Sequence, residues 1–325
     1  MKLSRILAAV ALAGALGVPH YLVRMDSYRG FEQPVFVDIP RGTSSLRIGE
    51  KLAEAGVLRN PFLFPLARLT KPSSKPQAGE YRFEKAATPA EVFARIARGD
   101  VYLVELRVPE GSDVFDIAEK VAAAGLAPAD EFLHAAKTRE GRLFPSTYLF
   151  RRGITPDEIC RAMEAQFNKV WSELKGAAGE RQRIVTLASI VETEAVLAEE
   201  RPKIAGVYMN RLAKGMRLEC DPTVEYAAKL DGRWKGVIYK TDLESANPYN
   251  TYRHEGLPPG PVANPGRDSL KAALHPEETD ALYFVARGDQ SGGHVFSKEY
   301  SEHQKAVAAY RKGQRNGHHD TGAPK

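Results

Sequence analysis

A pattern of about 28 residues occurs twice in the chain, and it constrains the fold more than any other feature of the sequence. The first copy spans residues 37–64 and the second spans residues 106–133, so equivalent positions are 69 residues apart. Because an internal repeat encodes one supersecondary unit twice, we expect the same local structure from both copies. The shared positions are Pro40 and Pro109, Gly42 and Gly111, Ile48 and Ile117, Glu50 and Glu119, Lys51 and Lys120, and Gly56 and Gly125.

Each copy predicts a short strand, a Pro-x-Gly turn and a capped helix that ends at a glycine. Between the copies, the sequence predicts a strand at residues 80–83 and a helix from Thr88 to Gly99. Residues 35–135 are therefore expected to form small α+β units. The predicted parts of the copies are strands at residues 35–39 and 102–108, caps at Thr43 or Ser44 and at Ser112 or Asp113, and terminal glycines at Gly56 and Gly125.

The order of strand, turn, capped helix and glycine resembles LysM-type glycan-binding modules. The same order is also common in proteins that bind no glycan, because a Pro-Gly turn before a capped helix is a general structural device. A glycan-binding region and a purely structural repeat therefore both remain possible for these residues.

The N-terminus predicts that the rest of the chain is exported. Lys2 and Arg5 precede an apolar run at residues 6–23, whose length of about 18 residues is just sufficient to cross a bilayer. Basic residues before such a run favour a cytoplasmic N-terminus. We therefore expect residues 1–24 to form a membrane anchor, and a cleaved signal peptide is the alternative because the run contains small residues.

Two carboxylates, Glu192 and Glu194, lie within a stretch of apolar residues. At about 100° per residue, the apolar side chains of residues 184–198 cover nearly the whole circumference of a helix, which predicts a central, buried helix. The two carboxylates project on opposite flanks. Burial raises the pKa of a carboxyl group, and an acid that is protonated near neutral pH can protonate a leaving oxygen. The alternative is a buried salt bridge with a nearby base: Arg183, Arg201, Lys203 or Arg211.

The C-terminal half also predicts a capped helix at residues 155–174, followed by long loops rich in Pro, Gly, Asn and Tyr. Aromatic and amide side chains that occur together in ordered loops suit a sugar-binding groove, and irregular connections are the alternative. Residues 313–325 are polar and are expected to form a disordered tail.

Composition excludes several other classes of protein. The net charge of +5 is mildly basic, and the chain has no dense Lys/Arg block, so we expect no nucleic-acid partner. Its two cysteines, Cys160 and Cys220, form no metal-ligand spacing, so we expect no metal; a disulfide and two free thiols both remain possible. No Gly-rich phosphate-binding loop occurs, so we expect no cofactor and disfavour a cofactor-dependent lyase.

Several motifs, in order along the chain, resemble the endolytic murein transglycosylase (YceG-like) family. They are LASIVETEA at 187–195, ERPKIAGVYMNRL at 200–212, CDPTVEYA at 220–227, NPYNTY at 247–252 and GLPPGPVANPG at 256–266. The resemblance covers most of the chain, to about Tyr310. One upstream motif departs from the family pattern, because Ser146 stands where an Asp is usual.

The resemblance implies an α+β protein with an N-terminal membrane helix, a small LysM-like region and a larger mixed α/β catalytic domain. The implied boundaries are residues 1–24, 25–105 and 106–312, with the catalytic domain in the periplasm and one pass through the inner membrane. It further implies a lytic transglycosylase that cleaves the bond between N-acetylmuramic acid (MurNAc) and N-acetylglucosamine (GlcNAc) in nascent glycan strands, leaving 1,6-anhydro-MurNAc ends. Peptidoglycan strands, and also peptidoglycan synthases, are the implied partners.

Glu192 occupies the position of the family's catalytic acid and base. By the same resemblance, the supporting or substrate-binding residues are Glu194, Asp221, Thr223, Tyr226, Asn247, Tyr249, Asn250, Tyr252 and Asn264. Two other functions remain open: a lysozyme-like hydrolase in which Glu192 and Asp221 activate water, and a non-catalytic glycan-binding scaffold that uses the repeated region.

Overall fold

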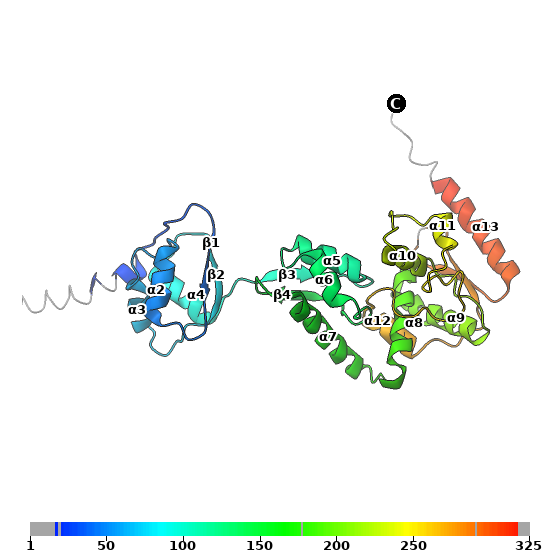
Figure 1. The fold of residues 1–325 in the computed structure, drawn as a ribbon, viewed down its shortest axis with the longest axis horizontal. Coiled ribbons are helices and arrows are strands. Elements are labelled where there is room, and N and C mark those ends of the chain that lie inside the picture. Colours follow the sequence, from blue (N-terminus) through cyan, green and yellow to red (C-terminus); the bar gives the residue numbers. More distant parts are fainter. Residues whose placement is uncertain (1–16, 19–20, 177, 290, 318–325) are drawn as a thin grey trace, which may run out of the picture. The chain divides into compact units, whose positions relative to one another are not determined.

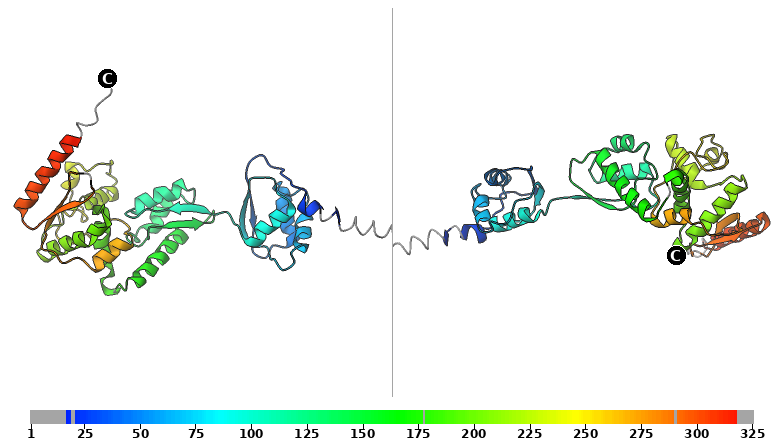
Figure 2. Two further views of the ribbon diagram at one scale, coloured as in Figure 1. Left: turned by 180° about the vertical axis from the view of Figure 1, so that it is seen from behind. Right: turned by 90° about the horizontal axis from the view of Figure 1, so that it is seen from below.

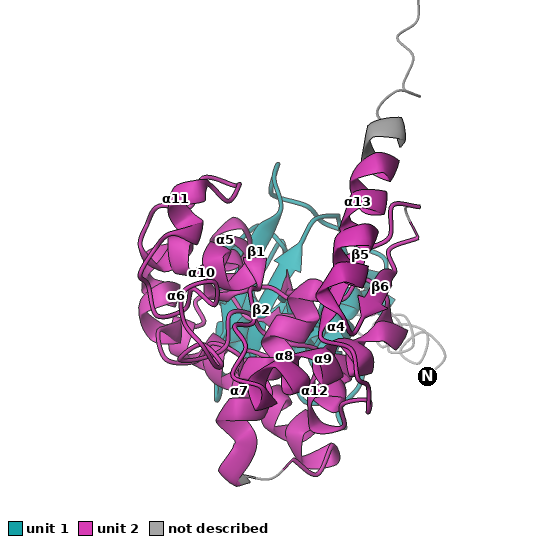
Figure 3. Ribbon diagram, turned by 90° about the vertical axis from the view of Figure 1, so that its right-hand side faces the viewer, with its two compact units in different colours: residues 1–104 teal, residues 105–325 magenta. Residues whose placement is uncertain are grey.

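The computed structural model describes residues 17–18, 21–176, 178–289 and 291–317. The chain divides into two compact units, Met1–Val104 and Glu105–Lys325, which are coloured separately in Figure 3. The first copy of the repeat lies in the first unit, and the second copy lies in the second unit.

The first unit combines a two-stranded antiparallel sheet with helices α2, α3 and α4 (Figure 1). Val35 pairs with Phe83, and Ile39 pairs with Gly79. Ser44 caps the first helix by accepting a hydrogen bond from the backbone N–H of Arg47. The strands predicted at 35–39 and 80–83 and the helix from Thr88 are therefore confirmed. The elements are β1 (Val35–Ile39), α2 (Ser45–Glu54), α3 (Leu63–Leu69), β2 (Gly79–Phe83) and α4 (Pro89–Arg98).

The second copy of the repeat forms the same local structure at the start of the second unit. Its strand is shorter than predicted and pairs with a strand at Thr147–Phe150. Asp113 caps its helix by accepting hydrogen bonds from the N–H groups of Phe115 and Asp116, and Gly125 ends it with a φ of +66°. The elements are β3 (Val104–Arg107), α5 (Val114–Ala123), α6 (Ala129–Ala136), β4 (Thr147–Phe150) and α7 (Pro156–Glu173).

Helix α8 (Arg181–Glu194) is the central element of the rest of this unit. All its residues from Ile184 to Glu192 are buried, which confirms the prediction of a buried helix. It contacts α9, α10 and α12, which lie beside it in Figures 1 and 2. The remaining elements are η2 (Ala198–Glu200), α9 (Arg201–Ala213), α10 (Asp221–Leu230), α11 (Lys240–Leu243), α12 (Arg267–Leu274), β5 (Tyr283–Ala286), β6 (His294–Ser297) and α13 (Tyr300–Gly317).

The structure corrects two predictions. The apolar helix does not continue to Ala198, because α8 ends at Glu194 and Val196, with 72% of its surface exposed, lies in the connection to α9. The boundary of the tail at residue 313 is also wrong, because α13 continues to Gly317; residues 318–325 lie outside the described residues.

Most of the anchor predicted at residues 6–23 also lies outside the described residues. Among the helices that the structure describes, none has both the length and the apolar character needed to cross a membrane.

Candidate active site

The carboxyl group of Glu192 is buried in the second unit, with only 4% of the side chain exposed. Its Oε1 accepts a hydrogen bond from Nη2 of Arg201 at 3.1 Å, and its Oε2 accepts one from the backbone N–H of Gly266 at 2.8 Å. Both contacts stabilise the ionised carboxylate. The salt bridge that the sequence left as an alternative is therefore present, and Arg201 is its base.

The turn of the second repeat lies against this carboxyl group. Gly111 donates its N–H to the carbonyl of Asn264, and a Cβ placed on Gly111 would lie 3.7 Å from Cγ of Glu192. The preceding residue, Glu110, reaches Gly266: a Cβ on that glycine would lie 2.0 Å from Oε1 of Glu110. Burial and the nearby charge of Glu192 raise the pKa of Glu110, and Arg201 opposes the shift.

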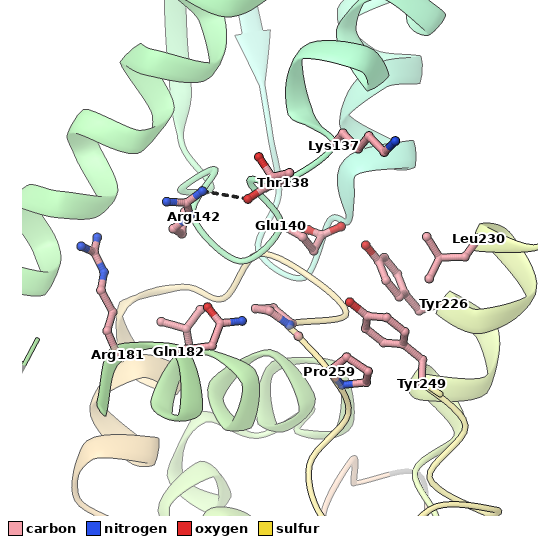
Figure 4. Close-up of a pocket in the computed structure, with 13 residues that line it drawn as sticks. Lys137, Thr138, Glu140, Arg142, Arg181, Gln182, Tyr226, Leu230, Tyr249 and Pro259 are labelled. Carbon is pink, nitrogen blue, oxygen red and sulfur yellow. Dashed lines mark hydrogen bonds between the residues drawn. The ribbon is translucent and has the colours of Figure 1, made fainter. Parts of the chain in front are cut away.

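A cavity of about 560 Å³ lies nearer the beginning of α8 and contains two of the predicted residues, Tyr226 and Tyr249. Figure 4 shows both hydroxyl groups pointing toward Glu140, which the sequence analysis did not select. Aromatic rings and polar groups in one cavity of this size suit a sugar. The other lining residues are Lys137, Thr138, Arg142, Arg181, Gln182, Val185, Leu230, Pro259, Gly260 and Pro261.

Glu140 joins three segments of the unit. Its carboxylate accepts hydrogen bonds from the N–H of Val114 at 2.9 Å and from Nδ2 of Asn264 at 2.6 Å, and it interacts with the hydroxyl of Tyr226. Burial nevertheless raises the pKa of Glu140 to about 8, and the charge of Asp113 adds to the shift. Glu140 is therefore a partly buried acid that titrates near pH 8.

A second cavity, of about 370 Å³, contains Glu194, Asp221 and Tyr252. Tyr252 donates its hydroxyl to Oδ1 of Asp221 at 2.6 Å, and the thiol of Cys220 donates to Oε1 of Glu194 at 3.1 Å. Since Glu194 follows Glu192 by two helical positions, the two side chains leave α8 about 160° apart. Asp221 therefore faces Glu194 rather than Glu192.

Four predicted residues hold the loops of the second unit together. Thr223 is fully buried and pairs with Thr251, and Asn247 donates to Asp231. Asn250 is also fully buried, and its Nδ2 donates to three backbone carbonyl groups. Asn264 joins the 260–266 loop to Ser112 and to Glu140. In this arrangement these side chains serve packing and hydrogen bonding, and their contacts are with protein groups.

Two acidic residues were missed, Glu110 and Glu140, and a sequence signal existed for each. Glu110 occupies the middle position of the Pro-x-Gly turn of the second repeat, where the first copy has Arg41. Glu140 is the first residue of the EGRLFPSTY segment, in which Ser146 stands where the family usually has Asp. Glu110 was detectable as an acid where the first copy of the repeat has Arg41. Glu140 was detectable as the acid that begins a family motif.

Neither cysteine is in a disulfide: Cys160 and Cys220 are free and buried. Burial raises the pKa of the Cys160 thiol to about 11, so it stays protonated at neutral pH. Within the described part of the chain, no group of three or more His, Cys, Asp or Glu side chains is arranged to hold a metal ion.

Comparison with known proteins shows the family of the chain. Residues 37–309 match the model of the YceG-like family. An endolytic murein transglycosylase of Bacillus subtilis is 35% identical over 309 residues, which cover 85% of this chain and 84% of that protein. One of Streptococcus pneumoniae is 28% identical, over 94% of this chain and 64% of the relative.

A solved structure gives the same result. The crystal structure of a YceG-like protein of Listeria monocytogenes is 30% identical, with a TM-score of 0.55, and the match covers 84% of this chain and 98% of that one. The mixed α/β fold with small two-stranded sheets is consistent with this family. The chain belongs to the YceG-like family.

Proposed function

We propose that the chain is an endolytic lytic transglycosylase that cleaves peptidoglycan glycan strands, with Glu192 as the catalytic acid and base. Three observations support this assignment: family membership, relatives that carry this activity in their names, and the placement of Glu192 in the interior of the second unit. The single observation that carries it is the buried Glu192 beside the turn of the second repeat.

One carboxyl group is sufficient for this reaction. Protonated Glu192 gives its proton to the oxygen between MurNAc and GlcNAc as the bond to C1 of MurNAc breaks. The C6 hydroxyl of the same MurNAc attacks C1, and this new bond closes the 1,6-anhydro ring. The proton of that hydroxyl passes to the Glu192 carboxylate. Because the nucleophile belongs to the substrate, proximity replaces an activated water.

The cavity with Tyr226, Tyr249 and Glu140 is the proposed site for a neighbouring sugar of the strand. Val185, which lines this cavity, and Glu192 are seven residues apart on α8, so they leave the helix in nearly the same direction and about 10 Å apart along its axis. A strand that follows α8 from this cavity would therefore run toward Glu192.

The hydrolase alternative has less support. It requires Asp221 beside Glu192, but Asp221 is bonded to Tyr252 in the cavity that contains Glu194. A non-catalytic scaffold would use the repeated region and would not need the buried Glu192. The inner-membrane anchor at residues 6–23, the periplasmic location, the LysM-like role of residues 25–105 and the contact with peptidoglycan synthases are part of the same proposal.

The test uses the full chain with uncrosslinked peptidoglycan polymer and compares wild type with Glu192→Gln. We expect the variant to fold and to lose at least about 10³-fold in rate, since it has no proton to give. Glu199→Gln, at an exposed carboxyl in η2, is the matched control and should cleave like wild type.

Mass spectrometry of the products separates the three functions. Anhydro ends support the proposal, and reducing ends, heavier by one water, indicate a hydrolase. Binding to the polymer without any product indicates a scaffold. Wild-type cleavage by Glu192→Gln would exclude Glu192 as the acid.

A further inference from the structure

The contacts of Glu192 favour its charged form, although the proposed reaction requires the neutral acid. The salt bridge with Arg201 and the N–H of Gly266 both favour the charged carboxylate, whereas protonation of the glycosidic oxygen requires the neutral acid. A further group must favour the proton at this site. Arg201 on α9 is bonded to Glu192, and Glu110 on the repeat turn is acted on by the charges of Glu192, Arg201 and Asp268 on α12.

Glu110 is held in position to act on Glu192. Its turn is fixed by two hydrogen bonds to the 264 segment: Gly111 N–H to the carbonyl of Asn264, at 3.1 Å, and Asn264 N–H to the carbonyl of Ser112, at 3.0 Å. Both carboxyl groups then approach Gly266, which donates its N–H to Glu192 and on which a Cβ would lie 2.0 Å from Oε1 of Glu110. The three atoms nearest to a Cβ on Gly266 all belong to Glu110.

The charges at this point do not balance if every group is ionised. The guanidinium of Arg201 is bonded to Glu192 and acts on Glu110, and Asp268 adds a further negative charge near Glu110. Like charges held close together favour protonation of one of them, as in carboxyl pairs that share a single proton. Glu110 is the member of the pair that is exposed to solvent, so it can exchange protons with water, whereas Glu192 is almost fully covered.

We propose that Glu110 is a positioning residue of this active site, and that the negative charge of its carboxyl group favours the protonated form of Glu192. This inference rests on the proposed function of Glu192. The proton of Glu192 passes to the glycosidic oxygen as the C1–O bond breaks, and the proton from the C6 hydroxyl returns to Glu192. No other reactant is needed, and the protein ends in the state in which it began.

Replacing Glu110 by Gln tests this, because Gln keeps the size of the side chain and removes its charge. Without that charge, Arg201 and the N–H of Gly266 act on Glu192 unopposed by Glu110, and both favour the carboxylate. We expect the alkaline limb of the kcat profile to shift down by about one pH unit and kcat at pH 7.5 to fall about tenfold, with KM nearly unchanged. Glu110→Asp, which keeps the carboxyl group, should restore most of the wild-type profile.

Gly266→Ala provides a second, independent variant. The φ of Gly266 is −74°, which alanine adopts without strain, so the added methyl group acts chiefly by displacing Glu110. We expect the same alkaline shift, and little further change when it is combined with Glu110→Gln. Glu119→Gln, at the exposed position on α5, is the control for loss of one charge and should leave the profile unchanged.

The outcomes separate this inference from the proposed function. If Glu110→Gln keeps the wild-type kcat profile while Glu192→Gln is inactive, Glu110 has no part in catalysis and only the inference fails. A loss that is equal at every pH and is accompanied by a lower Tm would show a structural role, which also overturns it. If Glu192→Gln is active, the proposed function itself fails.

Discussion

The two turns of the repeat have the same backbone and different surroundings. Gly42 and Gly111 have φ values of +82° and +78°, and each follows a Pro-x dipeptide. At Gly42, no atom beyond the adjoining residues lies within 4 Å of the position that a Cβ would occupy, and its neighbour Arg41 is exposed. At Gly111 the corresponding space borders Glu192, and the neighbour is Glu110.

This difference separates what the repeat needs for folding from what one copy adds for function. The proline, the glycine, the cap and the terminal glycine occur in both copies because the strand, turn and helix depend on them. The middle residue of the turn is not constrained by the backbone, so it differs between the copies. Only in the second copy is the turn bonded to the 264 segment beside the proposed acid.

The largest difference is expected when the two helix caps are removed. Asp113 accepts backbone N–H bonds and a 2.6 Å salt bridge from the mostly buried Lys229, whereas Ser44 caps an exposed helix start. Asp113→Ala should cost about 3 kcal/mol in unfolding free energy, and Ser44→Ala about 1 kcal/mol. Hydrogen exchange, which reports on each unit separately, measures both; equal losses would contradict the comparison.

A smaller difference is expected when alanine replaces the turn glycines. Both substitutions place a side chain at a positive φ and should cost about 1 kcal/mol in stability. Only Gly111→Ala strains a turn that lies against Glu192, so we expect kcat for glycan cleavage to fall about tenfold there and to stay unchanged in Gly42→Ala. If both variants cleave at the wild-type rate, the second turn has no influence on the acid.

The smallest effect concerns Glu140, which follows the second copy of the repeat. Because its pKa is about 8 in the folded protein, Glu140 keeps a proton that the unfolded chain loses above about pH 4.5. Its contribution to stability is therefore present at low pH and is lost as the pH rises toward 8.

Glu140→Gln removes this titration. We expect the fall in Tm between pH 5 and pH 8 to shrink by a few °C in the variant. Exchange protection in the first unit, which does not contain Glu140, should be the same in both proteins. An unchanged slope in the second unit would show that Glu140 is ionised throughout this range.

Local sequence signals predicted the parts of the fold that depend on neighbouring residues. Strand β1, the cap at Thr88 and the buried character of α8 all follow from residues within one element. The end of α8 at Glu194 was missed because the following residues are Ala, Val and Leu. Pro202 gave the signal, since proline favours the first turn of a new helix and disrupts the interior of an existing one.

The candidate site was only partly predictable, because it is assembled from distant segments. Glu192 was found through the motif that contains it, but its contacts with Gly266 and with the turn of the second repeat depend on tertiary packing. The same packing divides the predicted residues between two cavities, one with Tyr226 and one with Glu194. No periodicity in a single segment carries that information.

The interruption between α8 and α9 determines whether Glu192 and Arg201 can meet at all. In one continuous helix, residues nine positions apart leave the axis on opposite sides and about 13 Å apart along it. The connection at residues 195–200 folds the chain back, so that the guanidinium lies 3.1 Å from the carboxylate. Insertions or deletions within this connection would therefore separate the two groups while leaving the two helices able to form.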